Sequence, residues 1–257
     1  MKYRLSNAAT RLQGQPMFKI LALAKDLEKQ GKDIIHLEIG DPDFSSPKEV
    51  IEAAYSSMKY GEVHYENSLG NREFRETIAL TTLRSRNFKP DLEQIIVTPG
   101  ANIAIYYAIS CLVNPGDEVI VPDPGFPTYY SAINYCNVKA VSVPLHEKNK
   151  FRMQPSDVEA AITHRTRIII VNSPNNPTGS VMTRNELEDM ARLAEKHDIY
   201  LLTDEIYSRM IYCDHDFYSP AMHDACLERT ILINGFSKAF AMTGWRLGWS
   251  FWPEHLV

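Results

Sequence analysis

Short apolar runs alternate with longer amphipathic stretches over most of the chain. Runs that we predict as buried strands lie at positions 95–97, 118–121, 138–143, 167–171, 200–202, 231–233 and 247–252. Apolar residues at helical spacing predict helices between them, at 103–112, 127–135 and 185–197. Alternation of strands and helices is typical of an α/β fold with a mostly parallel sheet.

The first forty residues follow a different pattern. An amphipathic run predicts a helix at 17–30, ending at Gly31 because glycine is a common helix C-cap. A strand is predicted at 34–39. We therefore predict that residues 1–43 form an N-terminal segment outside the main sheet, contributing to a small domain or a dimer arm. Residues 44–257 are predicted to form one large domain.

Composition narrows the classes of function. The chain has 257 residues, 44% of them hydrophobic, which is enough to bury a sizeable core. Its net charge of −5, with acidic and basic residues interspersed, argues against a nucleic-acid partner. Residues 1–6 lack the apolar core of a signal peptide, and no apolar stretch is long enough to span a bilayer. Neither secretion nor membrane insertion is expected.

The cysteines are scattered along the chain. Cys111, Cys136, Cys213 and Cys226 form no CxxC pair, and no histidine lies at metal-ligand spacing from them. We interpret them as reduced thiols with packing roles in a cytoplasmic protein, and we predict no metal site.

Glycines, prolines and polar residues gather just after the predicted strands. They occupy positions 99–100, 122–126, 172–179, 204–207 and 235–238. Parallel sheets bind ligands at the carboxyl ends of their strands. The coincidence of several such segments at one edge predicts a ligand site there.

One of these segments carries a lysine. Gly235, Phe236 and Ser237 precede Lys238, and Arg246 follows eight residues later. A partly desolvated lysine amine can form a Schiff base with an aldehyde, and an arginine with a nearby hydroxyl can hold a phosphate. Taken singly, either residue also fits a surface lysine or a structural arginine.

With Gly244 and Gly248 in place, this string resembles the signature of class I/II aminotransferases around the lysine that binds pyridoxal 5′-phosphate (PLP). The whole chain is similar to fold type I PLP enzymes, in particular to bacterial and archaeal aspartate and aromatic aminotransferases. The resemblance implies a three-layer α/β/α fold and assigns PLP to Lys238, with Ser237 and Arg246 at its phosphate.

Two further motifs acquire roles through the resemblance. Asp204 matches the carboxylate that faces the pyridine nitrogen of PLP, and Tyr207 matches a donor to the O3′ oxygen of the cofactor. Asn176, in the string Asn-Ser-Pro-Asn-Asn-Pro-Thr-Gly at 172–179, matches a second O3′ donor. Without the resemblance, Asp204 is equally consistent with a capping residue, and the string at 172–179 with a rigid turn.

A turn and an aromatic ring complete the implied cofactor site. Gly100, Ala101 and Asn102 lead into the helix predicted at 103–112, where backbone N–H groups can bind an anion. The resemblance makes this turn a phosphate-binding element. It also places Phe126 on the face of the pyridine ring, although an isolated phenylalanine is more often a core residue.

The resemblance implies a homodimer with shared active sites. Tyr65 matches a tyrosine that reaches the PLP phosphate of the partner subunit. Gly40, Asn176 and Phe126 match positions that contact substrate. Gly235 departs from the commonest pattern, which has a serine there, so one phosphate contact is expected to be lost.

The implied reaction moves an amino group from an amino acid to a 2-oxo acid through the Lys238 Schiff base, with Lys238, Asp204 and Tyr207 as catalytic residues. A C–S or β-lyase and a truncated, impaired PLP-binding protein remain alternatives. In the family, the C-terminal part supplies most of the small domain and the arginine that pairs with the substrate carboxylate. Neither Arg4 nor Arg11 matches that arginine, so we expect this small domain to be absent. The sequence does not select the amino acid.

Overall fold

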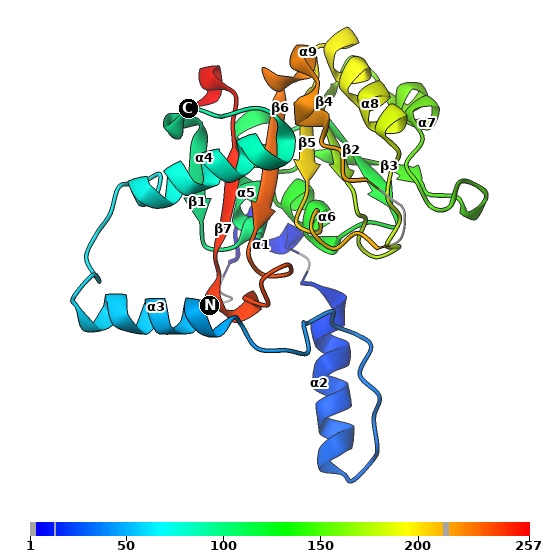
Figure 1. Ribbon diagram of the computed structural model, residues 1–257. Helices are drawn as coiled ribbons and strands as arrows, with labels where there is room; N and C mark the ends of the chain where they lie inside the picture. The colour runs from blue at the N-terminus through cyan, green and yellow to red at the C-terminus, as the bar shows by residue number, and fades with distance from the viewer. Residues whose placement is uncertain (1–3, 13, 213–215) are drawn as a thin grey trace.

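A seven-stranded sheet forms the centre of the computed structural model, which describes residues 4–12, 14–212 and 216–257 (Figure 1). The strands are β1 (Ile95–Thr98), β2 (Glu118–Asp123), β3 (Lys139–Pro144), β4 (Thr166–Asn172), β5 (Tyr200–Asp204), β6 (Thr230–Gly235) and β7 (Gly248–Phe251). They are ordered β1-β7-β6-β5-β4-β2-β3, and β7 runs antiparallel to both of its neighbours. The predicted mostly parallel sheet is confirmed.

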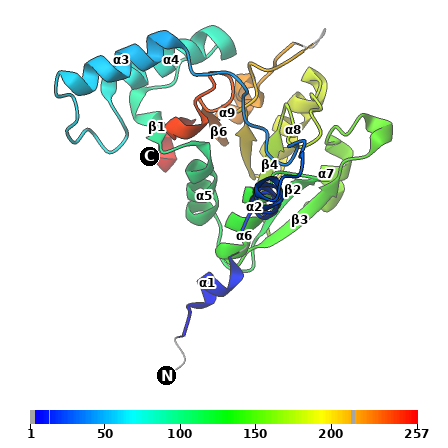
Figure 2. The ribbon, with the colours of Figure 1, turned by 90° about the horizontal axis from the view of Figure 1, so that it is seen from below.

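Helices cover both faces of this sheet. The α-helices of the described residues are α1 (Asn7–Arg11), α2 (Pro16–Lys29), α3 (Lys48–Lys59), α4 (Arg72–Arg86), α5 (Ala101–Leu112), α6 (Pro127–Tyr135), α7 (Pro155–Ala161), α8 (Arg184–Lys196) and α9 (Asp224–Leu227). Helices α5 and α6 pack on one face, and α4, α7 and α8 pack on the other. Figure 2 shows α4 and α8 on the opposite side of the sheet from α5 and α6. The three-layer architecture is therefore confirmed.

Strand β6 shows how the two faces acquire separate cores. Ile231 and Ile233 belong to the apolar cluster under α5 and α6, whereas Leu232 belongs to the cluster under α4. Successive side chains of a strand point to opposite faces, so an uninterrupted apolar run supplies both cores. Each fully buried isoleucine or leucine contributes about 1.5–3 kcal/mol from transfer out of water.

Asparagines set both ends of α4. The Asn71 side chain accepts a hydrogen bond from the Phe74 amide at the N-terminus of the helix. Asn87 takes the left-handed conformation, with φ of +59°, and ends the helix. The last residue of α4 is Arg86, which is buried.

The N-terminal helices lie at the periphery of the sheet. Helix α2 projects away from the body of the molecule (Figure 1), and its bounds agree with the helix predicted at 17–30. Helix α1 contacts the body through Arg11, whose guanidinium donates to the carbonyl oxygens of Asn134 and Tyr135 at 3.0 and 3.1 Å. This arginine therefore caps the C-terminal end of α6.

The strand predicted at 34–39 is wrong. The segment forms no ladder among the described residues, and Ile35 and Leu37 are 84% and 88% exposed. His36 instead contacts Glu28 of α2 and Glu38, at 2.9 and 2.7 Å. Alternating apolar residues favour a strand only where a neighbouring strand can pair with it.

Two of the sequence-based interpretations fall partly outside the described residues. Cys213, interpreted above as a reduced thiol, lies there, and so do residues 1–3 of the N-terminal stretch that lacks a signal-peptide pattern. Of the described cysteines, Cys111, Cys136 and Cys226 are free thiols. None of the described helices is long and apolar enough to cross a bilayer.

Candidate active site

The predicted site residues follow strands that end at the same edge of the sheet. Gly100 follows β1, Phe126 follows β2, Asn176 follows β4, Asp204 ends β5 and Lys238 follows β6. These five strands run parallel to one another, so their carboxyl ends all lie at that edge. The fold thus collects residues that are separated by up to 138 positions in the chain.

Asp204 is the most deeply buried ionisable group of this set. Its Oδ2 atom accepts a hydrogen bond from the Tyr129 hydroxyl at 2.7 Å, and its Oδ1 atom accepts one from the Ile206 amide at 3.2 Å. Burial raises the pKa of Asp204 to about 6, although both hydrogen bonds oppose that rise. A carboxylate kept in so dry an environment is suited to a cationic partner.

Tyr129 is a site residue that the sequence reasoning missed. It lies in α6, three residues after Phe126, and is fully buried. Burial and the neighbouring Asp204 raise its pKa well above the usual range, so it acts as a neutral donor. Its position in the sequence could have indicated this role. Tyr129 follows Phe126 by three residues, and residues at that spacing are neighbours on one side of a helix.

Two predicted hydrogen-bond donors meet at the end of β4. The Asn176 side-chain amide lies 3.3 Å from the Tyr207 hydroxyl, to which it donates. Asn172 holds this turn in place, because its Oδ1 accepts a hydrogen bond from the backbone N–H of Asn176 at 2.7 Å. Its Nδ2 donates to the Asp204 carbonyl at 3.0 Å. The amide side chain of Asn172 therefore couples the Asn176 turn to the end of β5.

Lys238 lies in the loop after β6 and is half-buried. Its Nζ donates to the Gly40 carbonyl at 2.6 Å, which brings another predicted position beside the lysine. Burial lowers the pKa of Lys238, and Arg246 adds to the decrease while Asp41 opposes it. A lowered pKa increases the fraction of neutral, nucleophilic amine at neutral pH.

The turn before α5 and Arg246 form a candidate anion site. Gly100 precedes the helix with φ of +86°, and a side chain there would overlap the Arg246 guanidinium. The positive φ favours glycine here, and the absent side chain leaves room for the Arg246 guanidinium. The guanidinium lies against a helix N-terminus, where Ala101 and Asn102 begin the first turn. Ser237 is half-buried in the loop before Lys238.

Phe126 and Tyr65 have different surroundings. Phe126 precedes α6 and is half-buried, with its ring edge-to-face with Tyr129 at 5.7 Å between centroids. Tyr65 is fully exposed in the segment between α3 and α4. Within one chain, Phe126 therefore lies beside Tyr129, the residue that donates to Asp204, whereas Tyr65 is exposed to solvent.

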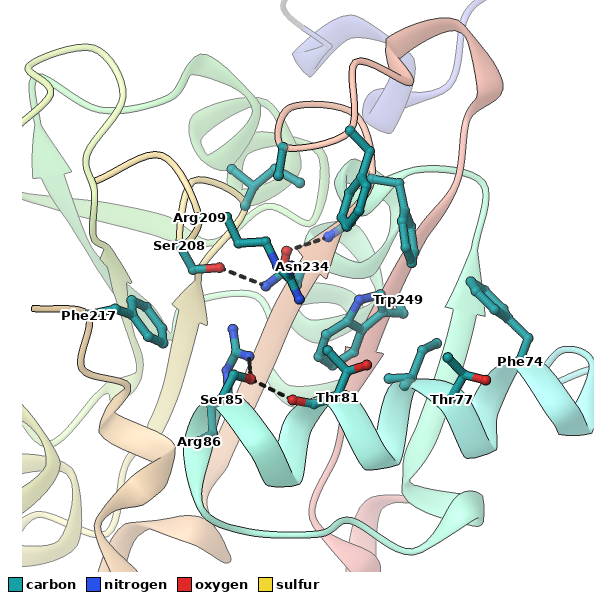
Figure 3. A pocket seen from close by; sticks show the side chains of 16 residues that line it. Phe74, Thr77, Thr81, Ser85, Arg86, Ser208, Arg209, Phe217, Asn234 and Trp249 are labelled. Carbon is teal, nitrogen blue, oxygen red and sulfur yellow. Dashed lines mark hydrogen bonds between the residues drawn. The ribbon is translucent and has the colours of Figure 1, made fainter. Parts of the chain in front are cut away.

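A cavity of about 300 Å³ lies under α4 on the other face of the sheet (Figure 3). Phe74, Phe217, Phe236, Phe240 and Trp249 supply much of its wall. None of the predicted site residues lines it. No cluster of three His, Cys, Asp or Glu side chains within the described ranges is arranged to hold a metal ion.

A family model for aminotransferases of class I and II matches residues 32–257. The chain belongs to the class I and II aminotransferase family. It is 41% identical to the arginine–pyruvate transaminase of Pseudomonas aeruginosa over 89% of the chain and 58% of that protein. It is 40% identical to the aspartate aminotransferase of Pyrococcus abyssi, over 90% of the chain and 60% of that protein.

The solved structure of the Thermus thermophilus aspartate aminotransferase with maleate is also similar to this aminotransferase fold. It superposes with a TM-score of 0.95 at 37% identity, covering 99% of this chain and 66% of that one. The chain spans about 60% of the length of the curated relatives named above.

Aminotransferases of class I and II depend on PLP, and the donor set of this site fits that cofactor. The buried Asp204 carboxylate matches a cationic ring nitrogen, and the α5 N-terminus with Arg246 matches a phosphate. The Lys238 amine, with its lowered pKa, matches an aldehyde.

Proposed function

We propose that the protein is a PLP-dependent aminotransferase that moves an amino group between an amino acid and a 2-oxo acid. The observation that carries this proposal is the buried Asp204 carboxylate, held by Tyr129 and Ile206 at the strand edge that also carries Lys238. A dry carboxylate without a cationic partner is costly, so a bound cation explains its presence.

Each residue of the site has a task in this proposal. The α5 N-terminus and Arg246 bind the phosphate, Phe126 packs on the ring, and Asn176 and Tyr207 donate to its phenolic oxygen. Asp204 keeps the ring nitrogen protonated. When bound, PLP supplies an aldehyde and an electron-withdrawing ring. The Lys238 Nζ would take the proton from the substrate α-carbon and deliver it to C4′, the carbon that the cofactor's aldehyde supplies, so that the amino group stays on the cofactor.

The proposal extends to assembly and location. We propose a homodimer, in which Tyr65 of each chain contacts the phosphate in the partner's site, and contacts of Gly40, Asn176 and Phe126 with substrate. We also propose a cytoplasmic location, which the free thiols among the described cysteines support. The relatives are named for arginine, aspartate and aromatic substrates, so we propose no side-chain preference.

A trapping experiment tests the role of Lys238. The chain is incubated with PLP, reduced with borohydride, digested and analysed by mass spectrometry. We expect one reduced cofactor on the peptide that contains Lys238. Lys238→Ala should abolish the adduct and lower amino transfer by a factor on the order of 10³, as expected for loss of a general acid–base group. The matched control is Lys89→Ala, which removes an exposed lysine.

Product analysis separates amino transfer from elimination. With an amino acid and 2-oxoglutarate, an aminotransferase forms glutamate, whereas a β-lyase releases ammonia and pyruvate. An adduct that persists in Lys238→Ala would contradict the assignment of the lysine. A specific adduct without glutamate formation would leave cofactor binding intact and contradict transamination.

A further inference from the structure

A buried ion pair lies directly behind Asp204, on the other face of the sheet. Arg86, the last residue of α4, donates from Nε to the Glu205 Oε2 atom at 2.7 Å, and its Nη2 lies 2.6 Å from the same oxygen. The two side chains are 4% and 1% exposed. Glu205 also accepts hydrogen bonds from the hydroxyls of Ser219 and Thr203. Its carboxylate thus accepts hydrogen bonds from three side chains.

The strand geometry explains why this pair sits next to the candidate site. Asp204 and Glu205 are consecutive at the end of β5, so their side chains point to opposite faces. Asp204 meets Tyr129 of α6, while Glu205 meets Arg86 of α4. Two carboxylates therefore share one dry strand end, and among the residues that the structure describes only Glu205 has a cation beside it.

The other groups around Asp204 leave Glu205 as the neighbouring anion. Tyr129 faces Asp204 from α6, Tyr207 faces it from the segment after β5, and the Ile206 amide donates to it. Burial raises the pKa of both tyrosines, so both are neutral at pH 7. Burial is the largest cause that raises the pKa of Asp204, and the charge of Glu205 adds to it. Within the described part of the chain, Arg86 is the cation paired with Glu205.

We propose that Arg86 is a positioning residue for the cofactor site, which keeps Asp204 ionised at neutral pH by cancelling the charge of Glu205. This inference rests on the proposed function, because an ionised Asp204 matters when it faces a cationic ring nitrogen. Arg86 itself contacts no part of the site. It acts through Glu205, across the thickness of the sheet.

The position of Arg86 is fixed by packing as well as by charge. Its guanidinium lies between the rings of Phe217 and Trp249, at 5.1 and 6.0 Å from their centroids (Figure 3). It also forms part of the wall of the 300 Å³ cavity. Replacing it therefore changes packing, and the test must separate packing from charge.

The test measures the protonation of Asp204 in the apo chain. Infrared difference spectra are recorded between pH 4 and pH 9, and the carbonyl band of protonated Asp204 is identified by its loss in Asp204→Asn. The midpoint is the pH at which this band has half of its full intensity. We expect Arg86→Met to raise the midpoint by about one pH unit or more, because the charge of Glu205 is then no longer cancelled. The Arg86→Met/Glu205→Gln double variant should return to within a few tenths of a unit of the wild-type midpoint.

Two further variants keep the test decisive if Arg86→Met does not fold. Arg86→Lys retains the charge without the planar fork and should keep the wild-type midpoint. Glu205→Gln leaves the cation without its partner and should lower the midpoint. An unchanged midpoint in Arg86→Met, or in Glu205→Gln when the first variant is unfolded, would show that the pair serves only to hold α4 against the sheet.

Binding of PLP provides a second readout. The dissociation constant at pH 7, measured by quenching of tryptophan fluorescence, should rise up to about tenfold for each unit by which the Asp204 midpoint rises. The double variant should recover the wild-type value. Failure of the wild-type chain to bind PLP would contradict the proposed function, whereas normal PLP binding with an unshifted Asp204 band would contradict only the inference about Arg86.

Discussion

At the scale of single residues, the candidate site depends on charges kept away from water. Asp204 is 4% exposed, and burial raises its pKa from 3.8 to about 6. A raised carboxyl pKa means that the folded chain holds the proton more tightly than the unfolded chain does. Ionised Asp204 therefore lowers the stability of the apo chain, and a bound cation is needed to recover it.

This reasoning predicts how Asp204→Asn changes stability with pH. Because the folded pKa is the higher one, wild-type stability relative to the variant falls as pH rises from about 4 to about 6. At about 1.4 kcal/mol for each pKa unit, the loss reaches a few kcal/mol at pH 8. Urea unfolding of the two apo chains between pH 4 and pH 8 measures it. The Asp33→Asn variant, which changes an exposed aspartate, serves as the control, and a constant difference for Asp204→Asn would contradict the prediction.

At the scale of elements, a carboxylate joins the beginnings of neighbouring strands far from the site. Glu118 begins β2, is 1% exposed, and accepts from the Thr163 hydroxyl, from Lys139 of β3 and from Arg165 before β4. The Thr163 hydrogen bond is the largest cause that lowers the pKa of Glu118 to about 2, with Lys139 and Arg165 adding to it against burial. This cluster fixes β2 between β3 and β4.

We predict that Glu118→Gln destabilises the chain by about 2–3 kcal/mol at pH 7. Because the folded pKa lies below the unfolded value of 4.5, the contribution of Glu118 is complete above about pH 4.5 and is lost as pH falls toward 2. Chemical unfolding at pH 7, 5 and 3 measures the difference from wild type, which should shrink below about pH 4.5. Glu147→Gln, at an exposed position, serves as the control. A difference that grows on acidification would contradict this account.

At the scale of the whole molecule, α3 carries an apolar stripe that the chain itself leaves uncovered. Ile51, Tyr55 and Met58 lie on one side of the helix at i, i+4 and i+7, and all three are exposed. The fully exposed Tyr65 follows α3 in the same part of the molecule. Exposed apolar residues on one helix face favour association with another protein surface, here proposed to be a second copy of the chain.

Met58→Glu is therefore expected to weaken the proposed dimer. A charge in an apolar interface is costly to bury, so the monomer fraction should rise at least tenfold at a fixed concentration. Sedimentation velocity measures this fraction, and PLP affinity should fall with it if Tyr65 acts on the partner's site. Ser56→Glu adds the same charge on the polar side of α3 and should leave assembly unchanged. Equal effects of the two variants would contradict the proposed interface.

The prediction of elements from sequence succeeded where a segment has two buried faces or a strongly amphipathic pattern. The strand predicted at 167–171 corresponds to β4, and the helix predicted at 185–197 corresponds to α8. The strand at 34–39 failed because its alternating pattern met no pairing partner among the described residues. The local pattern thus predicts strands that are buried on both faces and helices that are strongly amphipathic. It does not show whether a second strand is present for an isolated stretch to pair with.

The sequence by itself determined the fold class, the family, and the identity of Lys238, Asp204 and Asn176 as residues at strand ends. Those features depend on local pattern and on motifs that are contiguous in the chain. Only the tertiary structure decided that Tyr129 donates to Asp204 and that Arg86 pairs with Glu205. These partners are 75 and 119 positions apart, and nothing in the local sequence of either one specifies the other. Their contacts follow from how helices α4 and α6 lie on opposite faces of β5, because consecutive side chains of a strand point to opposite sides of the sheet.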